Sequence, residues 1–416
     1  MPAVKHRASR EGRPDRRGCL AGAALTAAVA AAALTLPGTA AAAPVTGPAR
    51  CTSSVPFTAG AGGYDTYRIP AVVRTARGTL LAFAEGRHSS AADTGNIDVV
   101  LRRSADGGCT WGPQTVVAAG NGDTRGNPAP VVDPRTGRIT LLTSYNSGQA
   151  TEAQIMRGEV TPEQSRRVFV QSSRDDGRTF TPPRDLTDTV KRPGWRWYAT
   201  GPGHAVALTR GPHAGRLVVP ANHSAAPPAG SADTGQEAKY YGAHALYSDD
   251  GGRTWRIGFV DDSYDGENNS NESTAAQLPD GRLYFSARDQ NGSNAGNRLD
   301  SYSGDGAETL DRPYAVQPAL SDVPVVQGSV LQTAGGKGKP LLFSGPSVPT
   351  ARQAMAIWRS DDAGATFTRS VTLSPLKAAY SDLVQPDRRT VGILYETGAT
   401  GTYETIEFRR IPLGDL

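Results

Sequence analysis

Short apolar runs separated by turn residues dominate the pattern along this chain. Apolar residues at the three- and four-residue spacing of an amphipathic helix are scarce. Instead, short apolar runs lie between glycine, proline, asparagine and aspartate, as in RLVVP (216–220), RLYFSA (282–287) and KPLLFSG (339–345). Because strands are short and are bounded by such residues, this pattern predicts an all-β fold with many short strands.

A turn-like octapeptide recurs along the chain. Its pattern is Ser-x-Asp-x-Gly-x-Thr followed by Trp or Phe, and the copies are SADGGCTW (104–111), SRDDGRTF (173–180), SDDGGRTW (248–255), SDDAGATF (360–367) and the degenerate SGDGAETL (303–310). In chain order, successive copies begin 69, 75, 55 and 57 residues apart. Six units of roughly 60 residues, each with about four strands, predict a six-bladed β-propeller, in which four-stranded units repeat radially.

The aspartate of each copy is expected to cap a hairpin turn. Its carboxylate can accept hydrogen bonds from backbone N–H groups two or three residues further on, while glycine supplies a positive φ. A cation site is the alternative, since SDDGGRTW contains two adjacent aspartates. The copies lack the alternating oxygen ligands and the closing glutamate of a calcium loop, so the sequence favours a structural turn.

The N-terminal segment is basic and then apolar. Six basic side chains within the first 17 residues precede an Ala-rich run over 19–36, and small residues follow at 41–43. This predicts a signal peptide over 1–43, a short linker over 44–55, the propeller over 56–416 and a secreted protein. The run is too short and too rich in alanine to favour a membrane span, and Arg16–Arg17 matches a twin-arginine signal only loosely, so the export route, Sec or Tat, stays open.

The net charge bears on the binding partner, and the cysteines bear on a possible disulfide. The net charge of +4 belongs to the predicted leader, which holds six basic and two acidic side chains. The rest of the chain is close to neutral, which argues against a nucleic-acid partner. Cys51 and Cys109 remain after the leader, and in an exported chain they could form one disulfide or stay as two free thiols.

Further motifs accompany the octapeptides: YRIPAVV (67–73), AFAEGR (82–87), GNPAPVVD (126–133), YATGPGHAVAL (198–208), RLVVPANH (216–223) and LYE (394–396). With the octapeptides, known as Asp boxes, they make the chain resemble the bacterial exo-sialidases, or neuraminidases, over almost its whole length beyond the leader. The resemblance implies a six-bladed β-propeller with its site at the centre of one face. It also implies hydrolysis of terminal sialic acids from glycoproteins, glycolipids and oligosaccharides.

Three arginines match the family residues that bind the substrate carboxylate: Arg68 in YRIP, Arg288 in SARD and Arg352 in TARQAM. Sialic acid carries this carboxylate on its anomeric carbon. Arginine suits the task because its planar fork binds a carboxylate through two N–H groups and keeps its charge at any working pH.

By the same resemblance, Tyr380 in KAAYSDL is the nucleophile and Glu272 in NSNEST is the base that activates it. A carboxylate nucleophile would be repelled by the carboxylate on the anomeric carbon, whereas a neutral phenol is not. Free tyrosine has a pKa of about 10 and therefore needs a base near neutral pH.

Asp93, in ADTGNIDVV, matches the family's acid/base aspartate and lies on a glycine-containing loop from which it could reach the glycosidic oxygen. Asp98 is the competing carboxylate. It lies in the strand-like NIDVVLRRS, so a structural role is expected for it.

Three more residues complete the expected site. Glu396 in LYE is expected to pair with Arg68 and to orient its guanidinium. Arg87 is expected to contact the ring hydroxyls or the carboxylate of the sugar, and Asn127 is expected in the pocket for the N-acyl group. The preference among N-acetyl, N-glycolyl and deaminated sugars, and among linkages, stays open.

The sequence leaves alternative functions open. A trans-sialidase would transfer the sugar to an acceptor, an intramolecular attack would release an anhydro sugar, and a sialic-acid-binding propeller would lack turnover. The loop over 224–242 either borders the aglycone or is an ordinary solvent loop. No metal-ligand pattern such as H-E-x-x-H occurs, so no essential cofactor is expected, and the protein is expected to be a free monomer.

Overall fold

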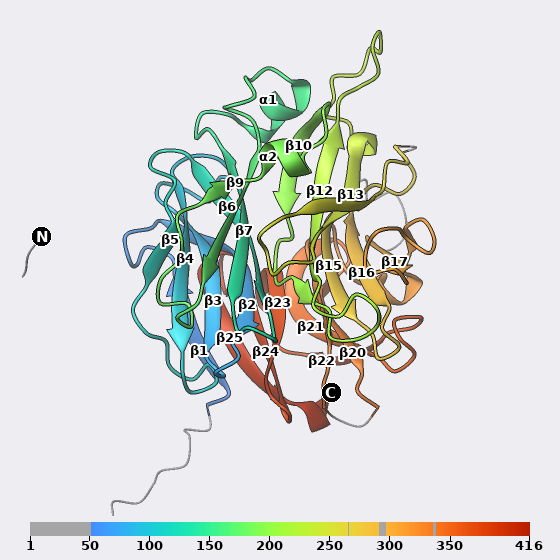
Figure 1. Cartoon of the computed structure of the whole chain (residues 1–416). Coiled ribbons are helices and arrows are strands. Elements are labelled where there is room, and N and C mark those ends of the chain that lie inside the picture. The colour runs from blue at the N-terminus through green and yellow to red at the C-terminus, as the bar shows by residue number, and fades with distance from the viewer. Residues whose placement is uncertain (1–50, 265, 291–296, 336–337) are drawn as a thin grey trace, which may run out of the picture. The chain divides into compact units, whose positions relative to one another are not determined.

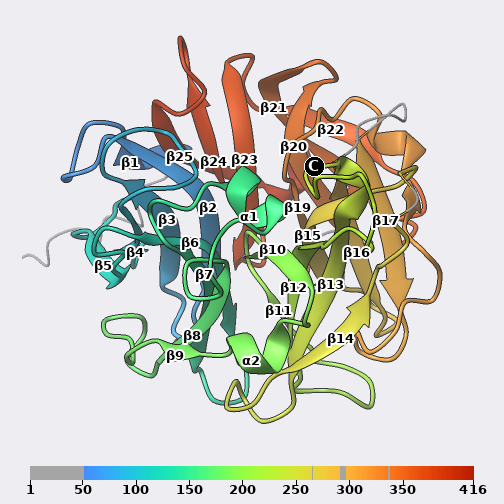
Figure 2. The same ribbon diagram turned by 90° about the horizontal axis from the view of Figure 1, so that it is seen from above.

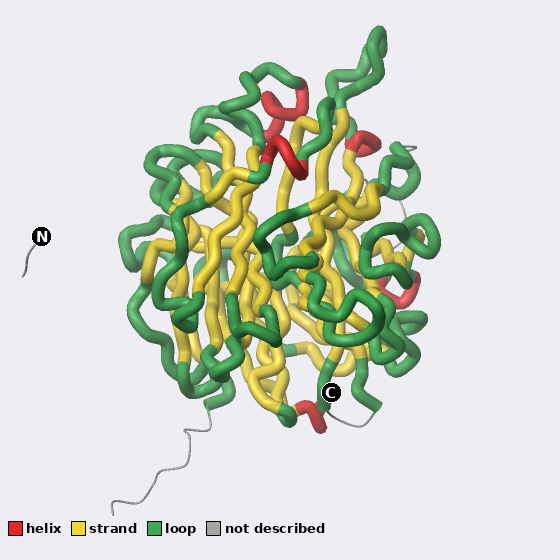
Figure 3. Tube along the Cα trace, viewed as in Figure 1, coloured by secondary structure: helices red, strands yellow, loops and turns green. Residues whose placement is uncertain are grey.

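The strands of this chain form small antiparallel sheets that follow one another along the sequence. The computed structural model describes residues 51–264, 266–290, 297–335 and 338–416. Strands dominate it, as Figures 1 and 3 show, so the all-β prediction is confirmed. The signal peptide predicted over 1–43 lies outside the described residues. Within the part of the chain that is described, no helix is long and apolar enough to cross a membrane.

Six antiparallel groups of strands recur within the described residues. The first consists of β2 (Thr66–Arg74), β3 (Leu80–Arg87), β4 (Ile97–Ser104) and β5 (Thr115–Ala118), and the second of β6 (Thr124–Val132), β7 (Ile139–Asn146), β8 (Arg167–Ser173) and β9 (Arg184–Asp185). The third consists of β10 (Trp195–Thr200), β11 (Val206–Ala207), β12 (Leu217–Ala225), β13 (Tyr241–Ser248) and β14 (Arg256–Val260). The fourth consists of β15 (Ser270–Gln277), β16 (Leu283–Asp289), β17 (Arg298–Ser303) and β18 (Ala315–Val316).

The last two groups complete the set. The fifth consists of β19 (Ser329–Gln332), β20 (Leu341–Val348), β21 (Ala351–Ser360) and β22 (Thr368–Thr372), and the sixth of β23 (Lys377–Asp387), β24 (Thr390–Gly398), β25 (Thr405–Pro412) and β1 (Ser53–Thr58). The helices are short: α1 (Glu152–Arg157), α2 (Thr187–Val190) and the 3-10 turns η1 (Ala238–Tyr240), η2 (Pro318–Leu320) and η3 (Leu413–Asp415). Single bridges join the first group to the second, at Ile97 and Thr124, and the fifth to the sixth, at Gln353 and Lys377.

The sixth group takes strands from both ends of the described chain. Its outer strand β1 pairs antiparallel with β25. β1 begins at Ser53, inside the segment 44–55 that was expected to be a linker. Just before β1, Cys51 forms a disulfide with Cys109, in the turn that follows β4. The N-terminal strand is thereby fastened both to the sixth group and to the first.

The inner strands of the groups contact one another in cyclic order. β2 lies against β6, β6 against β10 and β11, β11 against β15, β15 against β19, β19 against β23, and β23 against β2. Figure 2 shows these strands gathered toward the middle of the view, with the later strands of each group outside them. The hydrogen-bonded sheets themselves remain separate and do not close into one sheet.

Each pair of neighbouring groups shares an apolar core. Val72, Leu394 and Phe408, for example, join the first and sixth groups in one cluster. Because both faces of a group are covered, a middle strand such as β3 is buried along its entire length, while the outer strand β22 is mostly exposed. Strands that are buried on both faces have no need for polar alternation, which is why the sequence shows continuous apolar runs.

The Asp boxes form the turns between the last two strands of each of the first five groups. In SDDGGRTW, Asp250 accepts hydrogen bonds from Thr254 Oγ1 at 2.6 Å and from the N–H groups of Arg253 and Thr254 at 2.9 Å. Ser248 Oγ donates to the same carboxylate at 2.9 Å and accepts from Gly252 N. These hydrogen-bond donors all belong to the same turn as Asp250, so the carboxylate caps the turn.

Candidate active site

β-Bulges in four strands position the side chains of the candidate site. The pairing register shifts in β2, β6, β15 and β23, next to Arg68, Asn127, Glu272 and Tyr380. A bulge inserts an extra residue and turns side chains away from the regular alternation. In β2 the residue after Arg68, Ile69, has a φ of 58°, a strained value for a β-branched side chain. The bulges thus aim polar side chains from separate groups at one place.

These side chains line one pocket of about 170 Å³. Eight of the nine residues that the sequence singled out lie on its wall: Arg68, Arg87, Asp93, Asn127, Glu272, Arg288, Arg352 and Tyr380. The ninth, Glu396, is fully buried beneath Arg68 and Tyr380. The expected residues are therefore brought together, although they come from every group except the third. No cluster of three or more His, Cys, Asp and Glu side chains in the described ranges is arranged to hold a metal ion.

Tyr380 and Glu272 form the shortest contact between the proposed reacting groups. The Tyr380 hydroxyl donates to Glu272 Oε1 at 2.6 Å, and Arg288 Nη1 lies 3.0 Å from Glu272 Oε2. Burial raises the pKa of Tyr380 well above its usual value and Glu272 raises it further, whereas the neighbouring arginines lower it. Tyr380 is therefore a neutral phenol with a carboxylate in position to take its proton.

Arginine side chains surround the Tyr380 ring. The guanidinium carbons of Arg68 and Arg352 lie 5.2 and 5.7 Å from the ring centre. Tyr403 supports both arginines, because Arg68 stacks 4.2 Å above its ring and Arg352 Nη1 donates to its hydroxyl at 3.2 Å. Together with Arg288 these cations form a positive wall around the phenol, where an anionic substrate group would be stabilised.

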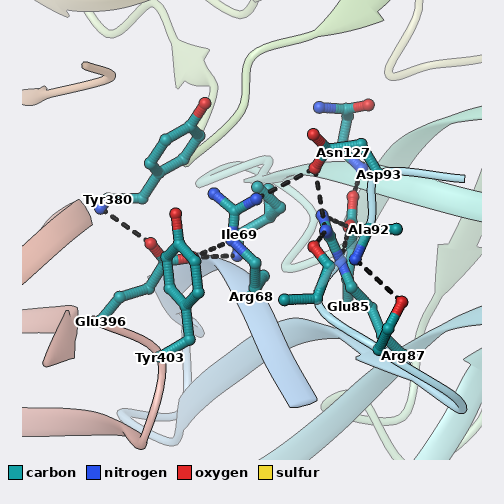
Figure 4. A network of polar contacts seen from close by, with 12 residues as sticks. Arg68, Ile69, Glu85, Arg87, Ala92, Asp93, Asn127, Tyr380, Glu396 and Tyr403 are labelled. Carbon is teal, nitrogen blue, oxygen red and sulfur yellow. Dashed lines mark hydrogen bonds and ion pairs between the residues drawn. The ribbon is translucent and has the colours of Figure 1, made fainter. Parts of the chain in front are cut away.

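Glu396 connects the bulges of β2 and β23. Its Oε1 lies 3.3 Å from Arg68 Nε and accepts the Ile69 N–H at 2.9 Å, while its Oε2 accepts the Tyr380 N–H at 3.0 Å. Figure 4 shows this carboxylate between the two strands. A fully buried carboxylate is tolerated only when it is paired and hydrogen-bonded, and here each of its bonds holds part of the site in place.

Asp93 projects into the site from the loop after β3. Its Oδ1 lies 3.0 Å from Arg68 Nη1 and 2.8 Å from Arg87 Nη1, and its side chain is 59% exposed. Burial raises the pKa of Asp93, but Arg87 and Arg68 lower it more strongly, so the net shift is downward. Asp98, the competing carboxylate, is buried outside the pocket, where it accepts hydrogen bonds from Tyr64 and Gly120.

Glu85 is a supporting residue that the sequence interpretation missed, although it lies within AFAEGR. Its Oε2 accepts from Arg87 Nη2 at 2.6 Å, and its Oε1 accepts the Asn127 N–H at 2.8 Å. A side chain at Gly126 would place its Cβ 2.2 Å from Glu85 Oε1, so it would displace the carboxylate from this position. Glu85 holds Arg87 and Asn127 much as Glu396 holds Arg68 and Tyr380 (Figure 4).

The sequence interpretation did not single out a second set of pocket residues. These residues are Glu152 at the start of α1, Arg166 before β8, Trp197 on β10, Asn222 on β12, Asn271 on β15 and Gln290 after β16. Asn222 lies inside RLVVPANH, and Asn271 directly precedes Glu272 in NSNEST, so membership of these motifs is the signal that could have found these two residues. Only the packing of the groups brings them to the pocket.

Comparisons with known proteins agree with this geometry. A family model described as a BNR repeat-like domain matches residues 78–393. The sialidase of Micromonospora viridifaciens is 32% identical over 347 residues, which are 81% of this chain and 50% of that protein. This chain thus spans about half the length of that relative.

Two further comparisons cover more of the matched protein. The exo-alpha-sialidase of Aspergillus fumigatus is 32% identical over 385 residues, which are 84% of this chain and 85% of that protein. Among solved structures, a Hadza microbial sialidase superimposes with a TM-score of 0.71 at 26% identity, over 85% of this chain and 67% of the other. The chain belongs to the sialidase family of glycoside hydrolases.

Proposed function

We propose that this protein is an exo-α-sialidase that releases terminal sialic acids from glycoconjugates and retains the configuration of the sugar. The observation that carries the proposal is the 2.6 Å hydrogen bond from the Tyr380 hydroxyl to Glu272 within a wall of arginines. A phenol paired with a base suits attack on a carbon that already bears a carboxylate, because an anionic nucleophile would be repelled there.

In the first displacement, Arg68, Arg288 and Arg352 bind the substrate carboxylate. Asp93 protonates the glycosidic oxygen as the bond from that oxygen to the anomeric carbon breaks, and the aglycone leaves as an alcohol. Tyr380 gives its proton to Glu272, and its oxygen bonds to the anomeric carbon to form a covalent intermediate.

The second displacement returns the enzyme to its starting state. The Asp93 carboxylate takes a proton from water, and the resulting hydroxide attacks the anomeric carbon. The bond from the carbon to Tyr380 breaks, and Tyr380 recovers its proton from Glu272. Sialic acid leaves, Asp93 ends protonated, and the next aglycone receives that proton.

Substrate binding prepares Asp93 for the acid step. In the free protein Asp93 contacts Arg68, which is proposed to bind the substrate carboxylate. An incoming carboxylate neutralises that arginine and adds a negative charge near Asp93. Both effects favour the protonated form of Asp93, as a general acid requires.

We infer further that the six groups form a six-bladed propeller. The cyclic contacts of the inner strands support this, as does the apolar core between the sixth and first groups. Residues 1–43 are proposed to direct export, because they combine a basic start, an apolar run and small residues at 41–43.

The test is hydrolysis of 4-methylumbelliferyl sialosides by wild-type protein and by Tyr380→Phe. Loss of the nucleophile should lower kcat by at least about 10³-fold while the fold survives, because only one oxygen is removed. Tyr395→Phe is the matched control: its hydroxyl donates to Glu407 at 2.9 Å, outside the pocket. Equal rates for Tyr380→Phe and wild type would exclude Tyr380 as the nucleophile.

The stereochemical course is measured separately. Proton NMR of the wild-type reaction should show the α anomer of the sugar before it mutarotates, as a double displacement requires. Initial release of the β anomer would contradict the retaining mechanism. Excess lactose in a parallel reaction detects transfer, because a trans-sialidase would form sialyllactose.

A further inference from the structure

A cavity of about 440 Å³ lies between the second and third groups, at the end of the strands that carries the Asp boxes. Its wall combines the turn after β6, which begins at Asp133, with parts of the Asp boxes 173–180 and 248–255. Asn127, nearer the other end of β6, belongs to the pocket wall. At about 3.3 Å per residue, the strand from Asn127 to Asp133 separates the two by roughly 20 Å. The cavity is therefore separate from the candidate active site.

A second cavity, of about 350 Å³, adjoins the first. Arg138 and Arg253 line both cavities, so the two form one continuous groove. Five arginines line it, and we call it the arginine groove: Arg135, Arg138, Arg174, Arg184 and Arg253. The wall of the second cavity contains three of these arginines and no carboxylate of a described residue.

Backbone carbonyls hold the three arginines of the second cavity. Arg138 Nη1 donates to the Gly251 carbonyl at 3.2 Å. Arg184 Nη2 donates to the Arg253 carbonyl at 2.7 Å, and Arg253 Nε donates to the Asp250 carbonyl at 3.1 Å. A neutral carbonyl fixes a guanidinium without cancelling its charge. Each arginine has five N–H donors, so most of them remain for a ligand, and a side chain that is already held loses less freedom on binding.

The carboxylates of the first cavity are engaged within the protein. Asp250 caps its own turn, and Asp133 accepts hydrogen bonds from the turn that follows it. Asp249 accepts from two N–H groups of Arg216, at 2.8 and 3.1 Å. These acids are therefore committed to other donors, and none of them forms an ion pair with the three arginines of the second cavity. The repulsion among those arginines would be relieved by a bound anion.

The remaining wall of the second cavity indicates the kind of anion. Ser172 and Thr181 add hydroxyl groups to it, and Val170 and Pro182 add carbon surface. A sugar ring presents hydroxyl and C–H groups that match such a wall. A sulfate ester on the ring offers three terminal oxygens to the three guanidinium groups, whereas a carboxylate offers two.

We propose that the arginine groove binds the sulfate groups of a sulfated glycan, at a site separate from the pocket. Two cavities that share Arg138 and Arg253 suit a chain that carries more than one anionic group. The inference goes beyond the proposed sialidase function and does not rest on it. A glycan bound at the Asp-box end leaves the pocket at the other end accessible, so the protein can be held on a sulfated surface while the pocket binds another ligand.

Isothermal titration calorimetry with a heparin oligosaccharide at physiological ionic strength tests the proposal. The same oligosaccharide after removal of its sulfates keeps the sugar chain and the carboxylates, and single-stranded DNA supplies phosphates without the sugar ring of a glycan. The sulfated form should bind at least about tenfold more tightly than either comparison. Equal binding of the desulfated form would overturn the assignment of sulfate. Equal or tighter binding of DNA would show a general attraction for polyanions, and no binding of the sulfated form would overturn the proposal outright.

Variants locate the binding in the groove. Arg184→Gln and Arg253→Gln each remove one cation and keep a polar side chain, so Kd for the sulfated oligosaccharide should rise by about fivefold or more in each. Arg388→Gln is the matched control, because Arg388 is an exposed arginine in the turn between β23 and β24, outside both cavities. It should bind as the wild type does. Wild-type affinity in both groove variants, or an equal loss in the control, would contradict the proposal, and thermal unfolding shows whether each variant keeps its fold.

Hydrolysis of a 4-methylumbelliferyl sialoside checks that the two sites are separate. A saturating concentration of the heparin oligosaccharide should leave kcat/KM of the wild-type protein unchanged. Competitive inhibition would place the oligosaccharide among the arginines of the pocket and would overturn the proposal of a separate site. The titrations do not depend on turnover, so they decide the proposal even if the protein hydrolyses no sialoside, an outcome that would contradict only the proposed function.

Discussion

At the scale of single residues, the site depends on carboxylates with different surroundings. Glu272 and Glu396 face arginines and hydrogen-bond donors, and Glu396 is fully buried. Asp93 is largely exposed and lies on a loop. The buried Glu396 holds Arg68, Ile69 and Tyr380 in place, whereas the two carboxylates proposed to transfer protons, Glu272 and Asp93, both reach the pocket.

Asp93 provides a prediction about pH. The proposed acid role needs the protonated form, and in the free protein Arg87 and Arg68 hold the pKa of Asp93 below the usual range. Activity should therefore fall as pH rises through that pKa. Because kcat/KM reports the free enzyme and kcat reports the complex, the descending limb should lie at higher pH for kcat than for kcat/KM.

Full pH–rate profiles on one sialoside check this expectation. Asp93→Asn serves as the comparison, since an amide neither titrates nor donates an acidic proton, and its weak residual activity should lack that limb. Descending limbs at the same pH in both profiles would mean that substrate binding leaves the proton affinity of Asp93 unchanged.

At the scale of elements, one end of the strands carries the pocket residues and the other end carries the Asp-box turns. β3 pairs with β4 so that Arg87 faces Ile97 at one end and Leu80 faces Ser104 at the other. The pocket residues lie at the first end and the Asp-box turns follow the second. Changes in an Asp box should therefore affect stability before they affect catalysis.

Asp250→Ala tests this separation. Burial raises the pKa of Asp250, but hydrogen bonds from Thr254, Ser248 and Arg253 outweigh it and lower the pKa to about 2. A pKa depressed in the folded state stabilises the protein above the unfolded value, and this contribution is lost as pH falls toward 2. After allowance for solvent screening, the variant should lose ~1 kcal/mol of unfolding free energy at pH 7.

Urea denaturation at pH 7 and near pH 2 measures both parts of this prediction, with kcat determined on the same samples. The difference from wild type should be smaller at the lower pH, while kcat at pH 7 stays unchanged. A large fall in kcat without loss of stability would mean that the turn acts on the site.

At the scale of the whole molecule, the two ends of the described chain are joined. β1 completes the sixth group beside β25, and the disulfide from Cys51 to Cys109 attaches its start to the first group. The apolar cluster between the sixth and first groups lies behind this junction. Loss of the junction would free an edge strand and expose that cluster.

Replacing both cysteines by serine should therefore destabilise the protein. The residues are 58 apart in sequence, and a disulfide that closes a loop of this size contributes about 2–4 kcal/mol, mainly by restricting the unfolded chain. The unfolding free energy in urea measures the loss, with reduced wild-type protein as the comparison. An unchanged midpoint in the double variant would show that the strand pairing of β1 suffices.

The sequence by itself determined the features that depend on neighbouring residues. It predicted the strands from short apolar runs, and the Asp-box turns from a serine, aspartate, glycine and threonine whose bonds all close within the octapeptide. It also placed nine candidate site residues by their resemblance to family motifs, and eight of them line the pocket. Local hydrogen bonding and strand propensity act over a few residues, so they can be predicted from the order of residues.

Only the tertiary structure decided which distant groups meet. Arg68 and Glu396 are 328 residues apart, and Glu85, Arg166 and Asn222 line one pocket although they come from distant segments of the chain. The pairing of Cys51 with Cys109, left open by the sequence, is likewise set by the place of β1 beside β25. These contacts arise from the cyclic packing of the strand groups, which depends on burial between whole sheets and cannot be read from spacing along the chain.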